Sequence, residues 1–565
     1  MGGDGHFDLD QYRRLVAGPV ENTLLDELRD GDLDRGEFLR RATIIGLSAS
    51  TIGAALASLG EPAPAFAQRG AVSVGGRLRV GINPGPTGAL EPHTLVDVGG
   101  LEACGITGEF LTRATKTLGL RAELATSWKP NKTATVWTFK LRPNVRFQSG
   151  QLLSADDVVA TYSRLVDPNS GSQALSAYRG VLSPGGIKKI DDLTVQFTLD
   201  GPNANFPYLT SSTTYQAIIL PASYQVGTFT MKPQTTGAFK ITSYTPGVGV
   251  KYDRFSGWWG GQVPLDGVDA TFYTDDAAVV AALLGGQIDL IGQINLTSAR
   301  PLLHNANVKI YSASGATHRQ VCIRTDYPGP LKDHRVREAI ALTLDRPRII
   351  KTLWAGLADL GNDSPFAPVF PSTNKHVPQR HKDLRKARQL MAAAGHAKGF
   401  PITLTTETVG EVPQLAQIIQ QSVRGINIKM KLNILTVTAY FAGSQTGPPL
   451  GWGATPWLNT PINITDWSHR AVPNVYLTSA YKSKGVWNAS HYSNKKLDAL
   501  INSYIAAISL KDQLRYETGM QEILLRDTPT IIPYFQFYLQ ALSTKVKGYV
   551  GDASGHIYLS RTSLA

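Results

Sequence analysis

The sequence predicts an α/β protein with more than one lobe, and three observations lead to that prediction. The chain has 565 residues, of which 42% are hydrophobic and 18% charged, a globular composition long enough for more than one core. Residues 128–168 read as strand, turn, strand and capped helix. Between residues 384 and 435, helices and strands are predicted to alternate, which is typical of an α/β lobe with parallel pairing.

The stretch 128–168 is the best-defined part of the chain. Residues 136–141 (VWTFKL) alternate apolar and polar side chains, the period of a half-buried strand. Ser154 then precedes a helical run that ends before Pro168, and Asp157 follows three residues later, close to a capping box. Capping therefore explains the adjacent carboxylates Asp156 and Asp157 better than acid–base chemistry does.

Other segments show periodicities of the same two kinds. The expected strands are 195–199, 268–272, 320–324, 402–405 and 428–435. The expected helices are 109–118, 277–284, 384–394, 412–423, 497–507 and 514–525. Residues 444–474 have no period and are rich in Gly, Pro, Asn and Thr, so we expect a long functional loop there.

Residues 1–67 are expected to be a targeting segment. Arg40 and Arg41 precede a mildly apolar run that ends near residue 59, too short for a membrane-spanning helix. The sequence Ala-Phe-Ala at 65–67 resembles a signal-peptidase site. Paired arginines before a weakly hydrophobic run are similar to a twin-arginine signal. The alternative is a plain secretory signal, and either would make the mature protein periplasmic or extracytoplasmic.

The charge and the motif content of the sequence narrow the range of possible functions. Residues 1–67 hold 6 of the 56 basic and 11 of the 44 acidic residues, so the remainder has 50 basic and 33 acidic residues. The basic residues are dispersed, so no nucleic-acid partner is expected. The chain lacks the sequence motifs of zinc proteases, serine hydrolases and phosphate-binding loops. Neither a metal nor a cofactor is therefore expected.

The sequence contains two cysteines. Cys104 and Cys322 are expected to form either one disulfide bridge or two separate buried thiols.

The stretch 128–168 resembles the signature region of the extracytoplasmic solute-binding proteins of family 5, which serve ABC importers of peptides and nickel. The matching positions are Ala125, Ser127, Trp128, Thr138, Phe139, Leu141, Arg142, Val145, Phe147, Gly150, Leu153, Ala155, Asp157, Val158, Tyr162, Asp167 and Pro168. Weaker matches extend from about residue 76 to residue 550.

The resemblance implies a two-lobe periplasmic-binding-protein fold of type II, similar to cluster C, with an extra subdomain in the first lobe. After the signal segment 1–67, it places the first lobe at 68–115 and 236–320, around an extra subdomain at 116–235. The second lobe is then 321–525, and residues 526–565 return to the first. The two lobes are expected to close on a ligand and the closed form to engage a membrane permease.

The same resemblance suggests ligand contacts. His93 and Thr94 match a loop that faces the ligand in the family, although a lone histidine is more often structural. The loop 444–474 matches a ligand-recognition loop, so Trp452, Trp457 and Trp467 are expected either to enclose the ligand or to pin the loop. Thr455 stands where peptide-binding members carry an aspartate that pairs with the ammonium group of a peptide. Asp466 is then the local candidate for that role, or else it caps a turn at Ser468.

The function that follows is a non-enzymatic, monomeric substrate-binding component of an ABC importer. Its ligand would be a peptide or another small polar solute. A secreted enzyme, such as a hydrolase, and an exported sensor or chaperone-like binder remain alternatives on the same scaffold.

Overall fold

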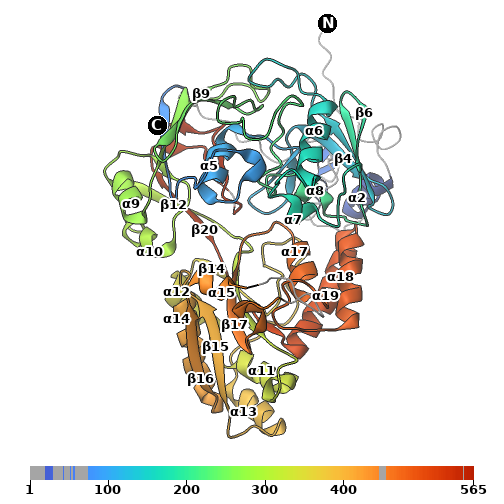
Figure 1. The fold of residues 1–565 in the computed structure, drawn as a ribbon, viewed down its shortest axis with the longest axis vertical. Coiled ribbons are helices and arrows are strands. Elements are labelled where there is room, and N and C mark those ends of the chain that lie inside the picture. Colours follow the sequence, from blue (N-terminus) through green and yellow to red (C-terminus); the bar gives the residue numbers. More distant parts are fainter. Residues whose placement is uncertain are drawn as a thin grey trace. The chain divides into compact units, whose positions relative to one another are not determined.

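The computed structural model describes residues 19–29, 38, 42, 51–52, 55–56, 74–443, 453–551 and 553–565. The chain divides into two compact units (Figure 1). Unit 1 comprises Met1–Tyr311 and Leu539–Ala565, and unit 2 comprises Ser312–Tyr538. The chain therefore passes between the units twice, whereas the sequence analysis expected these passages after residues 320 and 525.

Unit 1 is built on a seven-stranded mixed sheet with the order β12-β20-β11-β1-β10-β9-β8. Strand β1 pairs in parallel with β10 and β11, and β9 runs antiparallel to both of its neighbours. The C-terminal segment completes this sheet, because β20 pairs with β11. The strands are β1 (Arg77–Ile82), β8 (Phe239–Thr245), β9 (Gly249–Arg254), β10 (Gly267–Phe272), β11 (Leu290–Ile291), β12 (Val308–Ala313) and β20 (Tyr538–Ser543).

A second, four-stranded antiparallel sheet lies within unit 1, with the order β4-β5-β7-β6. Its strands are β4 (Ala125–Pro130), β5 (Val136–Leu141), β6 (Ile187–Asp191) and β7 (Thr194–Thr198). Helix α6 (Ala155–Val166) packs on this sheet (Figure 1). Trp137, Phe139 and Leu141 are buried, as the alternation of the sequence predicts. The predicted capping box of Ser154 and Asp157 is also confirmed.

Shorter elements complete unit 1. Its other helices are α2 (Pro19–Arg29), α5 (Val98–Thr107), α7 (Leu175–Tyr178), α8 (Phe206–Leu209), α9 (Asp276–Leu284), α10 (Leu296–Ala299) and the 3₁₀ turns η1 (Pro92–Thr94) and η2 (Arg300–Leu302). Three strand pairs are β2 (Thr112–Ala114) with β3 (Leu120–Ala122), β21 (Val546–Lys547) with β24 (Ser563–Leu564), and β22 (Val550–Gly551) with β23 (Ile557–Tyr558).

The helix predicted at 109–118 is wrong. Helix α5 lies upstream and ends at Thr107, with Gly108 as its C-cap, and residues 112–114 form strand β2. The reason is tertiary, because the backbone carbonyl oxygens of Glu109, Phe110 and Leu111 accept hydrogen bonds from Ile219, Leu124 and Ala125 instead of from a following helical turn. The Glu109 carboxylate also accepts hydrogen bonds from the indoles of Trp258 and Trp259, both at 2.8 Å.

Unit 2 contains a seven-stranded sheet with the order β14-β19-β13-β17-β15-β16, in which β18 also pairs with β13. The strands are β13 (His318–Ile323), β14 (Ala358–Leu360), β15 (Pro401–Glu407), β16 (Lys429–Leu435), β17 (Ile462–Trp467), β18 (Thr530–Ile531) and β19 (Tyr534–Gln536). Strand β15 pairs in parallel with both β16 and β17, which confirms the predicted parallel α/β pairing.

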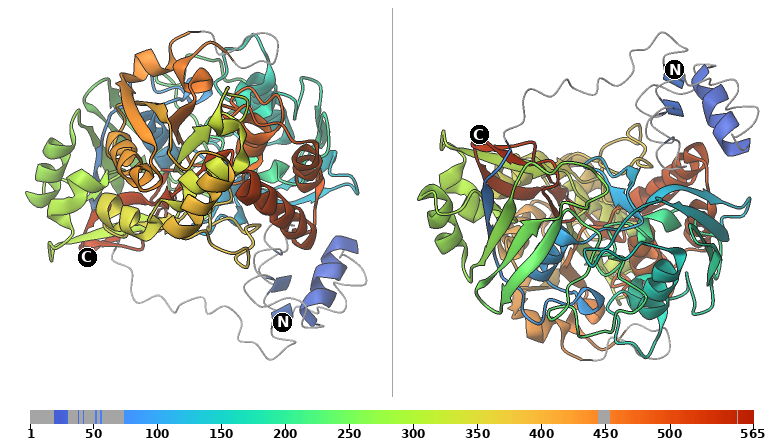
Figure 2. Two further views of the ribbon diagram at one scale, coloured as in Figure 1. Left: turned by 90° about the horizontal axis from the view of Figure 1, so that it is seen from below. Right: turned by 90° about the horizontal axis from the view of Figure 1, so that it is seen from above.

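Helices surround this sheet, and α18 and α19 pack against each other as the red pair in Figures 1 and 2. The helices of unit 2 are α11 (His334–Leu342), α12 (Arg346–Trp354), α13 (Leu384–Ala393), α14 (Val412–Val423), α15 (Val437–Phe441), α16 (Pro456–Asn459), α17 (Asn474–Tyr476), α18 (Lys495–Ala506) and α19 (Leu510–Asp527). Single turns are η3 (Pro330–Lys332), η4 (Arg424–Ile426) and the π turn η5 (Leu477–Tyr481).

The expectation of an unbroken loop at 444–474 is wrong. Residues 462–467 form β17, an interior strand between β13 and β15. Its first four residues are all buried, although two of them are polar. Neighbouring strands satisfy the backbone of this segment on both sides, which its own composition does not reveal.

The two cysteines do not form a bridge. Cys104 lies in α5 of unit 1 and Cys322 in β13 of unit 2, and both are buried free thiols. Of the two alternatives drawn from the sequence, the disulfide is wrong. Among the described residues, no helix is both long and apolar enough to cross a membrane.

Candidate ligand-binding site

Five functional side chains gather at one edge of the unit 2 sheet. Because β15 and β17 are parallel, Glu407 at the end of β15 lies near Asp466 and Trp467 at the end of β17. Strand β13 runs antiparallel and begins at the same edge, where His318 pairs with Trp467 and Arg319 with Asp466. Topology therefore unites residues that are far apart in the sequence.

The positive charge of Arg319 is directed mainly at Glu411. Its guanidinium donates to both carboxylate oxygens of Glu411, with Nε–Oε1 at 2.9 Å and Nη2–Oε2 at 3.2 Å. Tyr534 donates a further hydrogen bond of 2.6 Å to the same carboxylate. The Asp466 carboxylate lies 3.8 Å from Nη1 of Arg319, a longer ion pair. Asp466 thus keeps part of its capacity for another cation.

Glu407 is fully buried beside Asp466, and among the described residues neither of its carboxylate oxygens has a hydrogen-bond donor. Burial and then the neighbouring Asp466 carboxylate raise the pKa of Glu407 from 4.5 to about 7. The Asp466 carboxylate thus favours the protonated form of Glu407. Such a pair requires either a shared proton or a cationic group from outside.

An aromatic cluster adjoins this pair of acids. The rings of Trp467 and His318 stack with their centroids 6.4 Å apart, and Tyr476 meets both rings edge-on. Trp487 lies 5.8 Å from Trp467. The indole N–H of Trp467 is buried and has no acceptor among the described residues. Asp466 lies in a strand rather than in a turn, and residues 468–470 continue directly from this edge.

Thr455 and Trp457 lie beside this edge rather than in it, and Trp487 packs against both the Trp457 cluster and Trp467. Thr455 precedes α16, and Trp457 lies in that helix within a buried cluster with Tyr440 and Leu458. The ring of Phe441 meets Trp457 at 5.6 Å. These contacts agree with the alternative in which the tryptophan pins its segment to the body. Trp452, Arg40 and Arg41 lie outside the described residues.

His93 and Thr94 belong to unit 1, in the turn η1. The imidazole of His93 is buried, and its Nε2 lies 3.0 Å from the carbonyl oxygen of Ser170. Thr94 is exposed. The contact of His93 agrees with a structural histidine.

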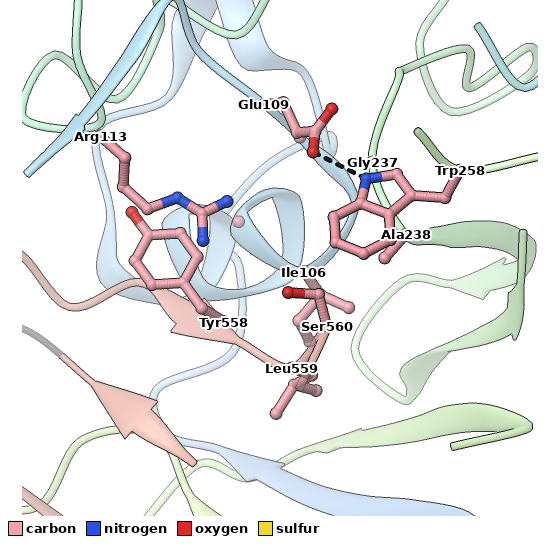
Figure 3. A pocket seen from close by; sticks show the side chains of 11 residues that line it. Ile106, Glu109, Arg113, Gly237, Ala238, Trp258, Tyr558, Leu559 and Ser560 are labelled. Atoms are coloured by element: carbon pink, nitrogen blue, oxygen red, sulfur yellow. Dashed lines mark hydrogen bonds between the residues drawn. The ribbon is translucent and has the colours of Figure 1, made fainter. Parts of the chain in front are cut away.

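Unit 1 contains a separate small pocket, whose lining residues are drawn in Figure 3. Its empty volume is about 260 Å³, including open solvent, which is below the usual size of a ligand pocket. Burial, and then the charge of Glu123, raises the pKa of Glu109 to about 7. Arg113 is paired with Glu123 and lies 3.9 Å over the ring of Tyr558. The charged groups here are thus already engaged with one another.

Several residues of the unit 2 edge were not found from the sequence. Glu407, Arg319 and His318 lie just outside the predicted strands 402–405 and 320–324, and His469 and Arg470 follow the unpredicted strand β17. Charged residues at the ends of otherwise buried strands were the available signal. The pairing order of the strands, which the sequence does not give, brings them together.

Comparison with known proteins identifies the family. The sequence profile of the bacterial extracellular solute-binding proteins, family 5, matches residues 119–488. The chain belongs to this family. This solute-binding protein is 24% identical to heme-binding protein A of Haemophilus influenzae over 461 residues, 77% of this chain and 82% of that one. It is 25% identical to the glutathione-binding protein GsiB of Escherichia coli K12 over 450 residues, 77% and 84% of the two chains.

Solved structures show the same fold. HbpA2 from Haemophilus parasuis superposes with a TM-score of 0.77 at 22% identity, over 87% of this chain and all of that one. The unliganded open form of the murein tripeptide-binding protein MppA gives 0.74 at 19% identity, over 87% and 98%. The two-lobe α/β fold and the role of substrate-binding component of an ABC importer are therefore established for this solute-binding protein.

Proposed function

We propose that this solute-binding protein captures a small solute carrying a cationic amino group, which binds at the Glu407–Asp466 pair. The observation that supports the proposal is the buried Glu407 carboxyl beside Asp466, whose oxygens have no hydrogen-bond donor among the described residues. An ammonium group supplies donors and a positive charge in place of the shared proton. The adjacent ring of Trp467 offers an apolar surface for the rest of the solute.

Several of the named ligands of related proteins belong to this class, whereas heme, the ligand named for heme-binding protein A, does not. The relatives and structural neighbours include proteins for glutathione, a nonapeptide and a murein tripeptide. A peptide or an amino-acid derivative contains the amino group that the carboxyl pair requires. We infer that the solute is then delivered to a membrane permease by a monomer that performs no chemistry on it.

The other predicted contacts carry less weight in this proposal. Trp452, Thr455, Trp457, His93 and Thr94 remain predicted ligand contacts. The burial of Thr455 and Trp457 and the carbonyl contact of His93 favour structural roles for these three. Asp466 and Trp467 are the predicted residues that lie with the newly found charged groups.

Substitution of Asp466 tests the amino-group contact. We expect Asp466→Asn to weaken binding by roughly 3–5 kcal/mol, because it removes the anion that pairs with a desolvated ammonium group. The solute is first released from the purified protein and identified by mass spectrometry, and its affinity is then measured by calorimetry. Asp326→Asn is the matched control, since Asp326 pairs with Arg324 elsewhere in unit 2. Equal affinities of wild type and Asp466→Asn would refute the contact.

We further propose export by the twin-arginine route. In the double variant Arg40→Lys, Arg41→Lys, the precursor is expected to accumulate in the cytoplasm, because that route reads the arginine pair. Cell fractionation and immunoblotting measure the outcome. Unchanged export of the double variant would leave the plain secretory signal as the explanation.

A further inference from the structure

The N-terminal segment has a small apolar core of its own. Its buried members come from the leader, residues 1–37, and from the expected export signal that follows it. None of them is more than 6% exposed. They are Leu24, Leu25, Leu28, Phe38, Ala42, Ala55 and Leu56, and Ile52 packs against them. Helix α2, labelled in Figure 1, therefore contacts the signal through apolar side chains.

The spacing of these residues puts each group on one helical face. Leu24, Leu25 and Leu28 stand at positions i, i+1 and i+4 of α2, so they form a single stripe. On the signal side, residues 51–52 and 55–56 are helical and repeat the same spacing. An isolated helix of 11 residues is only marginally stable in water. The apolar run of the signal is therefore the partner that stabilises α2.

The charge of the leader also opposes contact between the signal and a membrane. Residues 1–37 contain 10 acidic and 4 basic residues, a net charge of 4 − 10 = −6 with His neutral. An export signal ordinarily begins with a positively charged region, and an anionic lipid surface repels an acidic one. The leader is thus suited to keeping the signal away from lipid rather than to bringing it there.

A buried carboxylate ties the leader to the folded part of unit 1. The side chain of Glu21 is 6% exposed, and its Oε1 lies 3.0 Å from Nζ of Lys129. Lys129 belongs to strand β4 of the four-stranded sheet. This ion pair is complete only when that sheet has folded.

We propose that helix α2 is an intramolecular cover for the export signal, which keeps the precursor off membranes until the cover opens. The apolar side chains that a membrane or an export receptor must contact are the ones that α2 buries. Cover and membrane therefore compete for one surface, and the apparent affinity for the membrane falls with the fraction of open precursor. The inference rests on the export proposed above and holds for either export route.

The cover concerns the precursor and not the mature protein. Helix α2 precedes the expected cleavage site at 65–67, so cleavage removes the cover and the signal together. The site at the unit 2 edge is independent of this contact, because the buried cluster belongs to unit 1.

The labelling rate of one introduced thiol measures how often the cover opens. Ala55→Cys places the thiol in the apolar core, at a position that is 2% exposed. The full-length precursor is treated with a maleimide, and modification of residue 55 is followed by mass spectrometry, with the rate in urea as the unprotected reference. We expect the folded precursor to be labelled at least about tenfold more slowly than this reference. Adding Leu24→Ala and Leu28→Ala should restore most of the rate, because two of the three leucines that bury the signal are lost.

A matched control is the double variant Asp26→Ala, Arg29→Ala. It also places two alanines in α2 and leaves the net charge unchanged, but its side chains are 40% and 58% exposed. This control should keep the protection of residue 55. Thermal melts of all variants report whether the rest of the precursor is folded.

Vesicle flotation gives a second readout, with residue 55 left unchanged. The vesicles contain phosphatidylethanolamine and phosphatidylglycerol. We expect the precursor with Leu24→Ala and Leu28→Ala to bind them about tenfold more tightly than the wild type or the control, because more of its signal is open. Equal binding of all three precursors would overturn the cover.

The labelling outcomes separate the cover from the export route. Labelling of Ala55→Cys as fast in the folded precursor as in urea would overturn the cover and leave the export proposal standing. The double variant Arg40→Lys, Arg41→Lys should keep the protection, since the cover consists of apolar side chains. Normal export of that variant would refute the twin-arginine route alone.

Discussion

At the scale of single residues, the carboxyl pair Glu407–Asp466 dominates the electrostatics of the unit 2 edge. Arg319 lies next to the pair, but its guanidinium already donates to Glu411. The carboxylate of Glu411 also accepts a hydrogen bond from the hydroxyl of Tyr534. Burial and then the charge of Asp466 raise the pKa of Glu407 to about 7, although the charge of Arg319 opposes the shift. Ligand binding and proton binding therefore compete for one place.

The competition predicts how affinity varies with pH. Below about pH 7 an ammonium must displace the shared proton, so the Kd should rise by up to about tenfold for each pH unit of acidification. Above pH 7 the pair is already ionised, and the Kd should level off. Glu407→Gln removes the titrating group and should flatten the profile. Calorimetry of the identified solute at several pH values measures the Kd of the wild type and of Glu407→Gln. The same dependence of Kd on pH in both proteins would contradict this mechanism.

At the scale of elements, helix α6 shows how a local signal is reinforced by distant contacts. Asp157 accepts hydrogen bonds from the backbone N–H groups of Ser154 and Ala222, both at 2.8 Å. The first bond belongs to the predicted capping box. The second ties the helix to a loop 65 residues away in the chain, which the sequence pattern does not indicate.

Neighbouring aspartates allow a matched test of this element. Asp157→Ala should lower the free energy of unfolding by about 2 kcal/mol or more, since it removes a cap and strands two backbone donors. Asp156→Ala removes only an exposed pair with Lys189 and should change stability by less than about 1 kcal/mol. Denaturant unfolding compares the two variants. Equal losses would mean that the cap and the tie to Ala222 contribute nothing.

At the scale of the whole molecule, buried titrating groups set the pH of greatest stability. Three buried carboxyls have pKa values above the ordinary 4.5, namely about 7 for Glu109 and Glu407 and about 8 for Glu517. Three buried histidines have pKa values below the ordinary 6.5, namely about 4 for His318 and His556 and about 3 for His469. Desolvation by burial is the largest cause in all six.

The three carboxyls and the three histidines change the stability in opposite directions as the pH changes. Each carboxyl holds a proton in the folded state that the unfolded chain releases above pH 4.5, so stability falls as pH rises from about 4.5 to the folded pKa of 7 or 8 and then levels off. Each histidine stays neutral when folded but is protonated when unfolded, so stability falls as pH drops below 6.5.

Between about pH 4.5 and 6.5 the two effects oppose each other, so stability should be greatest there. Each group changes the free energy of unfolding by about 1.4 kcal/mol per pH unit, but only between its unfolded and its folded pKa. Scanning calorimetry should give a higher unfolding temperature near pH 5.5 than near pH 8 or pH 3.5. Both units contain groups of each kind, so unfolding of either unit should show the trend. An unfolding temperature that rises steadily up to pH 8 would contradict it.

The sequence by itself determined the family and most regular elements of this protein, because these depend on local periodicity and motif spacing. Strand 136–141, the capped helix after Ser154 and the helix 412–423 all follow from residues close to one another in the chain. Tertiary structure decided what local pattern does not contain. It made a polar stretch at 462–467 an interior strand and kept Glu109 out of a helix. It also brought Glu407, Asp466 and Arg319 to one edge, because strands from three distant segments pair there.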